Sequence, residues 1–253
     1  MNKELYKEIF RRKSFHTFME RNDEKITEDE INDIYNAYKN FESLNPDIKT
    51  TIRIDKKEKT GFTRSAEYSI LMFSEKKDGY LQNIGYLGEQ LDLYLVSKNI
   101  GSLWFGIAKS DEVYEGLNYV IQIGIAKVDS DKFRKDMFKA KRKEVAEMWD
   151  GEDYNIANIV RFAPSACNSQ PWYVESKDNE LSVYRISKSG KVGIMPKNAA
   201  VFFNQIDIGI FMCFVELCLI NEGIEFDRLL YKDNESFDKK ELNAKYSLKN
   251  TTK

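Results

Sequence analysis

Apolar residues recur at helical spacing in five parts of the chain. Residues 2–11 interrupt their apolar positions with Lys and Glu, whereas residues 204–221 are apolar almost throughout and are expected to be buried. Thr27 opens a TEDE capping-box pattern, which predicts a helix start at that point. The predicted helices are residues 2–11, Thr27 to the loop at Asn45-Pro46, 79–99, 152–162 and 204–221.

Shorter segments have the alternation or the β-branched and aromatic content that is typical of strands. The predicted strands are residues 50–55, 68–73, 119–127, 172–175 and 181–186, with a weaker candidate at 244–248. Residues 101–106 are predicted to form a tight apolar loop after the third helix.

The two longest apolar helices belong to an internal repeat. Residues 83–101 align with residues 207–225 without a gap, at an offset of 207 − 83 = 124 positions. The identical pairs are Ile84/Ile208, Gly85/Gly209, Leu93/Leu217, Leu95/Leu219 and Ile100/Ile224. Both halves also place helix, loop, strands, long helix and strand in the same order. The pattern therefore predicts an internal duplication.

Composition and charge exclude several classes of function. Hydrophobic residues make up 42% of the chain and charged residues 32%, which is ordinary for a globular protein. The 39 Lys and Arg nearly balance the 41 Asp and Glu, so a dedicated nucleic-acid-binding protein is not expected. His16 is the only histidine, which argues against a His-rich metal site and against a Ser-His-Asp triad.

The cysteines and the N-terminus indicate a cytoplasmic protein. The chain has three cysteines, Cys167, Cys213 and Cys218. An odd count without a CxxC spacing supports neither a disulfide framework nor a zinc cluster. The first residues mix charges with apolar side chains, unlike a signal peptide. The longest apolar stretch, residues 206–220, contains Asp207 and Glu216, so no membrane-spanning helix is predicted.

The strongest candidate for chemistry is the loop at residues 163–172, with the sequence APSACNSQPW. Small residues let a flat ligand approach the backbone, and Asn168 and Gln170 each offer two donors and an acceptor. Pro164 and Pro171 restrict the backbone, so the amides are aimed in advance. The alternative is an ordinary helix-to-strand connection. Two carboxamides and two serines between two prolines favour a binding loop.

Two further segments are weaker candidates. Residues 11–18 (RRKSFHTF) combine guanidinium and hydroxyl groups, which suit a phosphate. On their own they are better explained as a solvated helix end with its favoured cations. Residues 101–106 (GSLWFG) would expose backbone amides at their glycines, with a helix C-cap that buries Trp104 as the alternative.

Together these segments resemble the nitroreductase family of FMN-dependent oxidoreductases. APSACNSQPW is similar to the flavin loop, RKSFHTF to the N-terminal phosphate motif, and NIGSLWFG to the central helix-to-loop segment. An ordinary member is a homodimer whose flavin takes one motif from each subunit. Here the phosphate motif lies in the first half and the loop in the second. The resemblance therefore implies the duplicated branch, in which one chain imitates the dimer and keeps one flavin site.

The resemblance also implies the architecture. It predicts an α+β fold with a mainly antiparallel sheet wrapped by helices, and with the two long helices crossing at the centre. The halves are expected at residues 1–148 and 149–253, forming one compact unit. Because the dimer interface would be internal, the chain is expected to be a monomer in solution, without a membrane or nucleic-acid partner.

Residue roles follow from the resemblance by position, and no metal ligand is among them. The implied phosphate ligands are Arg11, Arg12, Ser14 and His16, the last standing where the family usually has Arg or Lys. The resemblance also implies further basic residues near the phosphate. These are Lys141, Arg142 and Lys143, with Arg142 the first choice. The flavin ring and ribityl chain are expected to meet Pro164, Ser165, Ala166, Asn168 and Gln170. The backbone of Trp104, Phe105 and Gly106 is expected to face the flavin N5 edge.

The chemistry implied is a ping-pong oxidoreduction. Bound FMN would take hydride at N5 from NAD(P)H and pass it to a small acceptor such as a nitroaromatic or a quinone. No catalytic side chain is required. A separate dinucleotide domain is not expected, because the chain has no GxGxxG segment.

Two other functions compete with this interpretation. One is a flavin carrier or sensor without turnover, which agrees with the loss of one site and with the departure at His16. The other is a cysteine hydrolase using Cys167 and His16, which would need the two side chains within hydrogen-bond reach. Cys167 is more simply explained as a small filler of the loop.

Overall fold

The computed structural model of the chain describes residues 1–56, 64–107, 110–188, 193, 195 and 199–249. These residues form two compact units, and each is described by itself. Unit 1 comprises Met1–Tyr80 and Leu87–Met137, and unit 2 comprises Leu81–Tyr86 and Phe138–Lys253.

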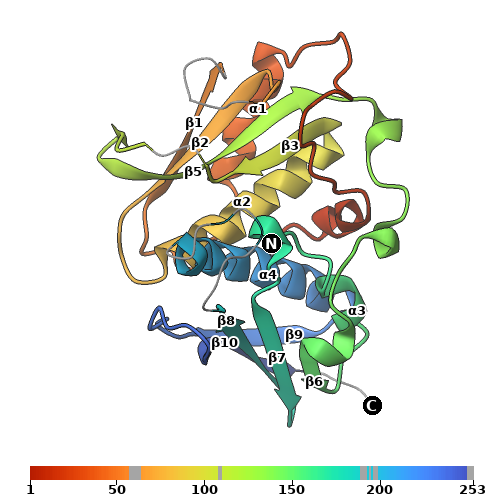
Figure 1. Ribbon diagram of the computed structural model, residues 1–253, viewed down its shortest axis with the longest axis vertical. Coiled ribbons are helices and arrows are strands. Elements are labelled where there is room, and N and C mark those ends of the chain that lie inside the picture. Colours follow the sequence, from red (N-terminus) through yellow and green to blue (C-terminus); the bar gives the residue numbers. More distant parts are fainter. Residues whose placement is uncertain (57–63, 108–109, 189–192, 194, 196–198, 250–253) are drawn as a thin grey trace. The chain divides into compact units, whose positions relative to one another are not determined.

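Unit 1 is built on an antiparallel sheet with the strand order β1-β2-β5-β3, to which β4 adds by pairing with β5. Its strands are β1 (Thr50–Lys56), β2 (Tyr68–Ser74), β3 (Ile100–Phe105), β4 (Val113–Tyr114) and β5 (Leu117–Lys127). Its helices are the 3₁₀ helix Lys3–Phe10, α1 (Glu28–Lys39), all but the first turns of α2 (Tyr80–Ser97) and the 3₁₀ turn Ser130–Lys132. Figure 1 shows the long strands β1, β2, β5 and β3 beside α1 and α2.

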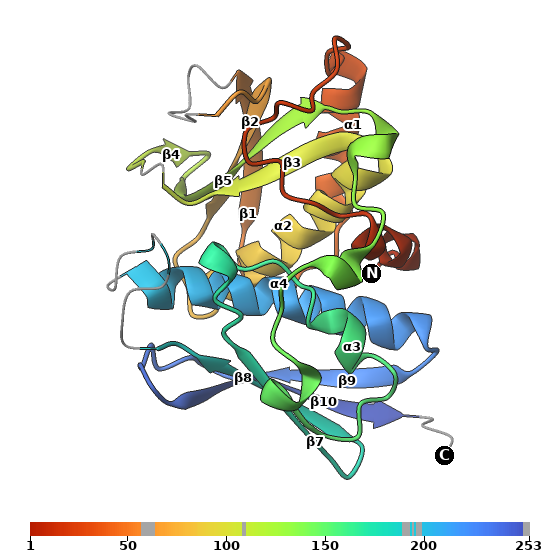
Figure 2. The same cartoon turned by 45° about the vertical axis from the view of Figure 1, so that its right-hand side comes forward.

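Unit 2 has a second five-stranded sheet, in the order β6-β7-β8-β10-β9. Its strands are β6 (Trp149–Gly151), β7 (Trp172–Lys177), β8 (Glu180–Ile186), β9 (Glu225–Leu230) and β10 (Lys240–Lys249). Its helices are α3 (Ala157–Val160), α4 (Ala200–Asn221) and the 3₁₀ turns Val145–Glu147 and Ala166–Asn168, and the turn Met137–Lys139 joins the units in sequence. Among the strands described in unit 2, β6 pairs with β7 in parallel and the other pairs are antiparallel. Figure 2 shows α4 lying along this sheet.

The two sheets have the same connectivity. In unit 1 two neighbouring strands, β1 and β2, precede α2, an edge strand β3 follows it, and β5 inserts between β2 and β3. In unit 2 the strands β7 and β8 precede α4, β9 takes the edge and β10 inserts between β8 and β9. This shared order, over segments that also align in sequence, confirms the duplicated α+β halves.

Equivalent glycines bring the first turns of α2 onto α4 within unit 2. A Cβ on Gly85 would lie 2.0 Å from the carbonyl oxygen of Ile206, and one on Gly209 would lie 1.9 Å from that of Gln82. These distances are far inside van der Waals contact, so only glycine permits this approach of the two backbones. The two contacts correspond at the offset of the repeat, since 209 − 85 and 206 − 82 both equal 124.

The repeat also places a buried carboxylate at the same point of each long helix. Asp92 on α2 accepts a hydrogen bond from Trp104 Nε1 at 3.0 Å. Glu216 on α4 accepts one from Arg228 Nη1 at 2.6 Å. Both pairs stand 124 positions apart (216 − 92 and 228 − 104). Each half therefore ties its long helix to its edge strand through a carboxylate that is shielded from water.

The helix predictions hold in part. The capping box at Thr27 is confirmed, with Glu30 N donating to Thr27 Oγ1 and Thr27 N donating to Glu30 Oε2. The 2–11 helix is a 3₁₀ helix, and the helix predicted at 152–162 shrinks to α3. Tyr154 and Asn155 have φ of 47° and 63°, outside the right-handed helical region, so no helix can run through them.

The predicted apolar loop at 101–106 is wrong, because these residues form β3 and pair with β5. Both faces of β3 are largely buried, so its sequence has no alternation. Gly101 is required there, because a Cβ would lie 2.8 Å from the Phe15 ring. The edge strand β9 was also not predicted. The short strands β4 and β6 were not predicted either. Strands β1, β2, β5, β7 and β8 lie where the pattern indicates, and the weak candidate at 244–248 lies within β10.

One helix among the described residues, α4, is long and apolar enough to cross a membrane. Its most apolar window has a mean hydropathy of 1.7, and 89% of that window is buried inside the protein. Burial in the core therefore accounts for its composition.

Candidate functional site

The loop at residues 163–172, in unit 2, has a strained backbone. Cys167, Asn168 and Gln170 have φ values of 51°, 55° and 47°, in the left-handed region that favours glycine. None of them is glycine, and such conformations persist only where surrounding contacts determine them. Asn168 and Cys167 are exposed, whereas Gln170 is buried. The loop therefore exposes the side chain of Asn168 to solvent, while neighbouring contacts hold its backbone.

One of the groups that fix the loop is Asp207, near the start of α4. Its Oδ1 accepts a hydrogen bond from Ala166 N at 2.9 Å. Its Oδ2 accepts from Ser169 Oγ at 3.2 Å and from Asn204 Nδ2 at 3.0 Å. Burial raises the pKa of Asp207 to about 7, and these three hydrogen bonds oppose the rise.

The basic run at 141–143 holds the loop from another side. Arg142 Nη1 donates to Asn168 Oδ1 at 2.9 Å, and Asn168 Nδ2 donates to Lys141 O at 3.2 Å. Lys143 N donates to Gln170 Oε1 at 2.8 Å, and Lys143 Nζ donates to Gln170 O at 2.7 Å. The structure thus brings the predicted loop residues together with the predicted basic run. Whether the run also meets a phosphate stays a prediction.

In unit 1 the segment predicted to bind phosphate, residues 11–18, contains Arg12, whose side chain is 5% exposed. Arg12 Nε and Nη2 both donate to Asp92 Oδ2, at 3.0 and 2.8 Å, and Nη1 donates to Ser14 Oγ at 3.1 Å. Asp92 also accepts from Ser102 Oγ and Trp104 Nε1. The predicted residues Arg12, Ser14 and Trp104 therefore belong to one cluster organised by a buried carboxylate.

A second carboxyl group in this cluster has no hydrogen bond. Glu89 is fully buried, and neither of its oxygens has a hydrogen-bond partner in the described structure, although Arg12 Nε lies 3.9 Å from Oε1. Burial and the neighbouring Asp92 raise the pKa of Glu89 well above its ordinary value, although Arg12 opposes them. These effects favour the neutral acid at Glu89.

The other predicted residues of unit 1 are placed as follows. Arg11 Nη1 donates to Glu8 at 2.8 Å and Nη2 to Asn99 Oδ1 at 2.9 Å. His16 is exposed. Phe105 is 4% exposed at the end of β3, and Gly106 follows it, half-buried.

Arg134 is a candidate that the sequence analysis missed. Its backbone N–H donates to Arg11 O at 2.9 Å, and Lys13 Nζ donates to Lys132 O at 3.1 Å, so this segment runs beside the phosphate motif. Arg134 is half-buried and has no acidic partner within the described residues. Burial and then the charge of Arg12 lower its pKa. Its only sequence signal was its place in the basic run after β5.

Asp207 and Asp92 were also missed as organising residues. Both are acids within long apolar helices, and that contrast was the signal available. A charge on a core helix requires compensating donors, which here come from the candidate loop and from β3.

Comparison with known proteins assigns the family. The model of the family described as "Putative TM nitroreductase" matches residues 4–219. The chain belongs to this family.

A solved structure of a putative nitroreductase has the same fold. The "putative nitroreductase" of Thermotoga maritima is 20% identical, with a TM-score of 0.60 over 98% of this chain and 93% of that one. A "putative NADH oxidase" of Clostridium acetobutylicum is 12% identical, with a TM-score of 0.43, over 58% of this chain and 99% of that one. A nitroreductase with bound FMN from Desulfitobacterium hafniense is 15% identical, with a TM-score of 0.39, over 57% and 100%. No curated protein matches the chain.

Proposed function

We propose that this nitroreductase-family protein is an FMN-dependent NAD(P)H oxidoreductase that reduces small organic acceptors such as nitroaromatics or quinones. The observation that carries the proposal is the strained loop at 163–172, which Asp207 and Lys143 hold from two sides. Clusters of left-handed non-glycine residues are found at ligand-binding sites, where the surrounding structure holds the strained backbone in place. The loop also has the sequence that resembles the flavin loop of the family.

The charges of unit 1 fit the phosphate of FMN. Arg12 and Arg134 are cationic, Asp92 balances one of them, and burial favours the neutral form of Glu89. One positive charge therefore remains for a bound anion. Arg12 would present its Nη1 side, together with the Ser14 hydroxyl, in the charge-assisted geometry that phosphate prefers.

The loop fits the isoalloxazine and ribityl groups. Asn168 is exposed, with its Oδ1 and Nδ2 directions set by Arg142 and Lys141. The small residues Ser165 and Ala166 leave the backbone accessible to a flat ring. FMN supplies the hydride chemistry when it is bound, and the residues of this chain bind and orient it.

The experiment that tests the function is an absorption spectrum of the purified protein, followed by anaerobic addition of NADH or NADPH. A flavin spectrum with one FMN per chain that bleaches with either nicotinamide supports an oxidoreductase. A flavin spectrum that resists both supports the alternative, a flavin carrier or sensor without turnover. A protein that neither contains nor takes up FMN contradicts both.

The phosphate contact is tested by Arg134→Gln. Loss of one charge-assisted contact is expected to weaken FMN binding about tenfold or more, because a hydrogen bond to a charged group contributes roughly 1.5–3 kcal/mol. Riboflavin lacks the phosphate, so its affinity is expected to stay unchanged. The matched control is Arg64→Gln, at an exposed arginine of the same unit. An equal loss for FMN and riboflavin would show that Arg134 acts on folding instead.

We further propose that the protein acts in the cytoplasm as a monomer on small molecules. The free state of its three cysteines supports a reducing compartment. Sizing chromatography with light scattering tests the oligomeric state, and a tight dimer at micromolar concentration would contradict the proposal.

A further inference from the structure

Three hydrogen-bond donors converge on the side chain of Asp207. They are the Ala166 N–H and the Ser169 hydroxyl, both on the loop at 163–172, and the amide of Asn204 one turn earlier on α4. Asp207 is 3% exposed. An ionised carboxylate only accepts hydrogen bonds, so it satisfies all three donors at once. A protonated carboxyl carries its hydrogen on one oxygen. On Oδ1 this hydrogen faces the Ala166 N–H, which can only donate, and on Oδ2 it faces the Ser169 hydroxyl, which must then turn and accept. The three-donor arrangement therefore changes in either case.

The repeat singles out the same residue. Position 83 is the equivalent of position 207, since 207 − 83 = 124, and it is occupied by Asn. The first half has the sequence NFESLNPDIK where the second half has the loop at 163–172. The carboxylate therefore occurs in the half that has the candidate flavin loop, and a carboxamide occurs in the half without it.

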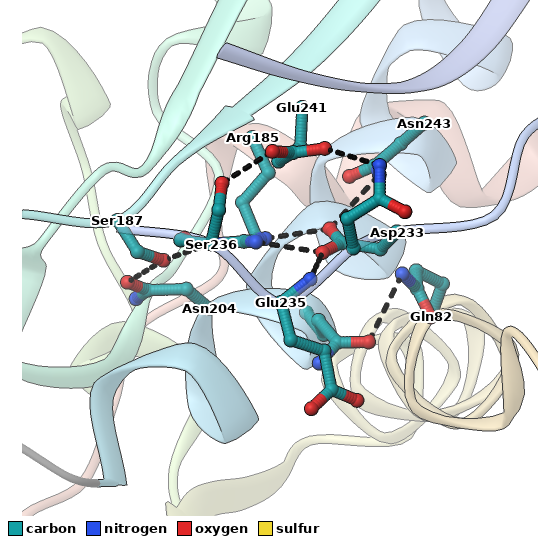
Figure 3. A network of polar contacts seen from close by, with 11 residues as sticks. Gln82, Arg185, Ser187, Asn204, Asp233, Glu235, Ser236, Glu241 and Asn243 are labelled. Atoms are coloured by element: carbon teal, nitrogen blue, oxygen red, sulfur yellow. Dashed lines mark hydrogen bonds and ion pairs between the residues drawn. The ribbon is translucent and has the colours of Figure 1, made fainter. Parts of the chain in front are cut away.

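Asn204, one of the three donors to Asp207, belongs to a polar network that Figure 3 shows. Asn204 Oδ1 accepts from Ser187 Oγ at 2.9 Å, and Ser187 in turn accepts from Arg185 Nη1. Arg185 is fully buried and donates to both carboxylate oxygens of Asp233, from Nε and Nη2, at 2.6 Å each. A bidentate pair of this kind fixes orientation strongly. Because Asn204 is held by this network, a change at Asp207 acts mainly on the loop.

We propose that Asp207 is the positioning residue of the flavin loop: its carboxylate holds Ala166 and Ser169 in the binding conformation, and protonation of that carboxylate releases them. The inference rests on the proposed function, because it assigns this loop to FMN. It adds a residue that does not contact the cofactor and that makes FMN affinity depend on pH.

Neutral pH is where the change is expected, because burial raises the pKa of Asp207 to about 7. Other charged groups lie around the loop and the network. Burial raises the pKa of Asp233, but the hydrogen bonds from Arg185, Asn243 and the Glu235 backbone, together with the charge of Arg185, lower it more, so Asp233 stays ionised. Lys143 and Arg142 contact the other side of the loop, and burial lowers the pKa of Lys143. A variant at position 207 separates its titration from theirs.

The experiment measures FMN affinity by flavin fluorescence between pH 5.5 and 8.5. The wild type is expected to bind about tenfold more tightly at pH 8.5 than at pH 5.5, which corresponds to one hydrogen bond to a charged group. Asp207→Asn imitates the protonated form, so it is expected to bind weakly at both pH values. Any titration of the FMN phosphate, with a pKa of about 6, occurs in both proteins and cancels in the comparison. Asp178→Asn, at an exposed turn of the same unit, is the matched control.

A second measurement follows the loop without FMN. Hydrogen exchange of the peptide that contains Ala166, corrected for the intrinsic pH dependence of exchange, is expected to show protection above pH 7 that is lost below it. Asp207→Asn is expected to remove the difference. This readout detects the proposed release even when no cofactor is present, and a purely structural role of Asp207 would not give it a midpoint near neutral pH.

The outcomes distinguish the two proposals. A wild type that binds no FMN at any pH overturns the proposed function. A wild type that binds FMN with the same pH profile as Asp207→Asn overturns the role of Asp207 alone. Protection of the loop peptide from hydrogen exchange that does not change with pH in the wild type also overturns that role.

Discussion

Replacing Asp207 with Asn is expected to change the pH dependence of stability in a direction that follows from its burial. The folded pKa is about 7, and the reference value is 3.8. The folded protein therefore binds this proton more tightly than the unfolded chain does. The stabilisation from this group is complete below about pH 4 and is lost as pH rises through about 7.

The magnitude follows from the size of the pKa shift. A rise of about three units corresponds to about 4 kcal/mol of unfolding free energy, at 1.36 kcal/mol per unit. Asn at position 207 does not titrate, so the variant does not lose this unfolding free energy as the pH rises. Relative to the wild type, the variant is expected to gain about 4 kcal/mol between pH 4 and pH 8. The variant would thus be relatively more stable at pH 8, where we expect it to bind FMN less well.

The assay is urea unfolding of wild type and variant at several pH values, followed by tryptophan fluorescence. Trp172 is a local probe, because its ring stacks on Phe211 in unit 2 with a centroid distance of 4.9 Å. Asp178→Asn is the control and is expected to run parallel to the wild type. A free-energy difference between Asp207→Asn and wild type that is constant from pH 4 to pH 8 would refute the reasoning.

Two further predictions concern the packing of the long helices and the buried ion pair. Gly209→Ala is expected to lower the unfolding free energy by about 2 kcal/mol, because overpacking outweighs the gain of roughly 1 kcal/mol in helix propensity. In Gly88→Ala the new Cβ would meet side chains and no backbone, namely the end of the Trp104 ring at 2.4 Å and Met72 Sδ at 3.2 Å. Urea unfolding should therefore show a smaller loss, and equal losses would contradict the close backbone approach. Asp92→Asn removes the carboxylate that accepts two hydrogen bonds from the buried Arg12, and it is expected to cost about 3 kcal/mol in the same assay. A loss below about 1 kcal/mol would show that the ion pair is not a structural requirement.

Much of the fold was predictable from periodicity. Helix α4 is apolar over nearly its whole length, α2 has apolar residues at helical spacing, and β1, β2, β5, β7 and β8 have strand-like patterns bounded by turn residues. The edge strand β9 was not predicted. The edge strand β3 was not predicted either, because it is buried on both faces and includes Gly101. Its extended conformation results from pairing with β5, which is a long-range interaction.

The candidate site was predictable at the level of segments, and less so at the level of contacts. The loop at 163–172 stood out by its prolines and carboxamides. The hydrogen bonds that Arg142 and Lys143 donate to this loop join segments 26 and 27 residues apart in the chain, and no local pattern reveals them. Asp207 was visible as an acid in an apolar helix, but two of its three donors come from a segment about 40 residues earlier in the chain.

The sequence by itself, through local patterns, determined the capping box at Thr27, the repeat that pairs Gly85 with Gly209, and the family motifs. These features depend on neighbouring residues or on copied segments, so they are readable without coordinates. Tertiary structure decided the left-handed backbone of the loop and the protonation of Glu89 and Asp207. Both depend on burial and on donors from distant segments, because the free energy of a charge or of a strained backbone is set by what surrounds it in space.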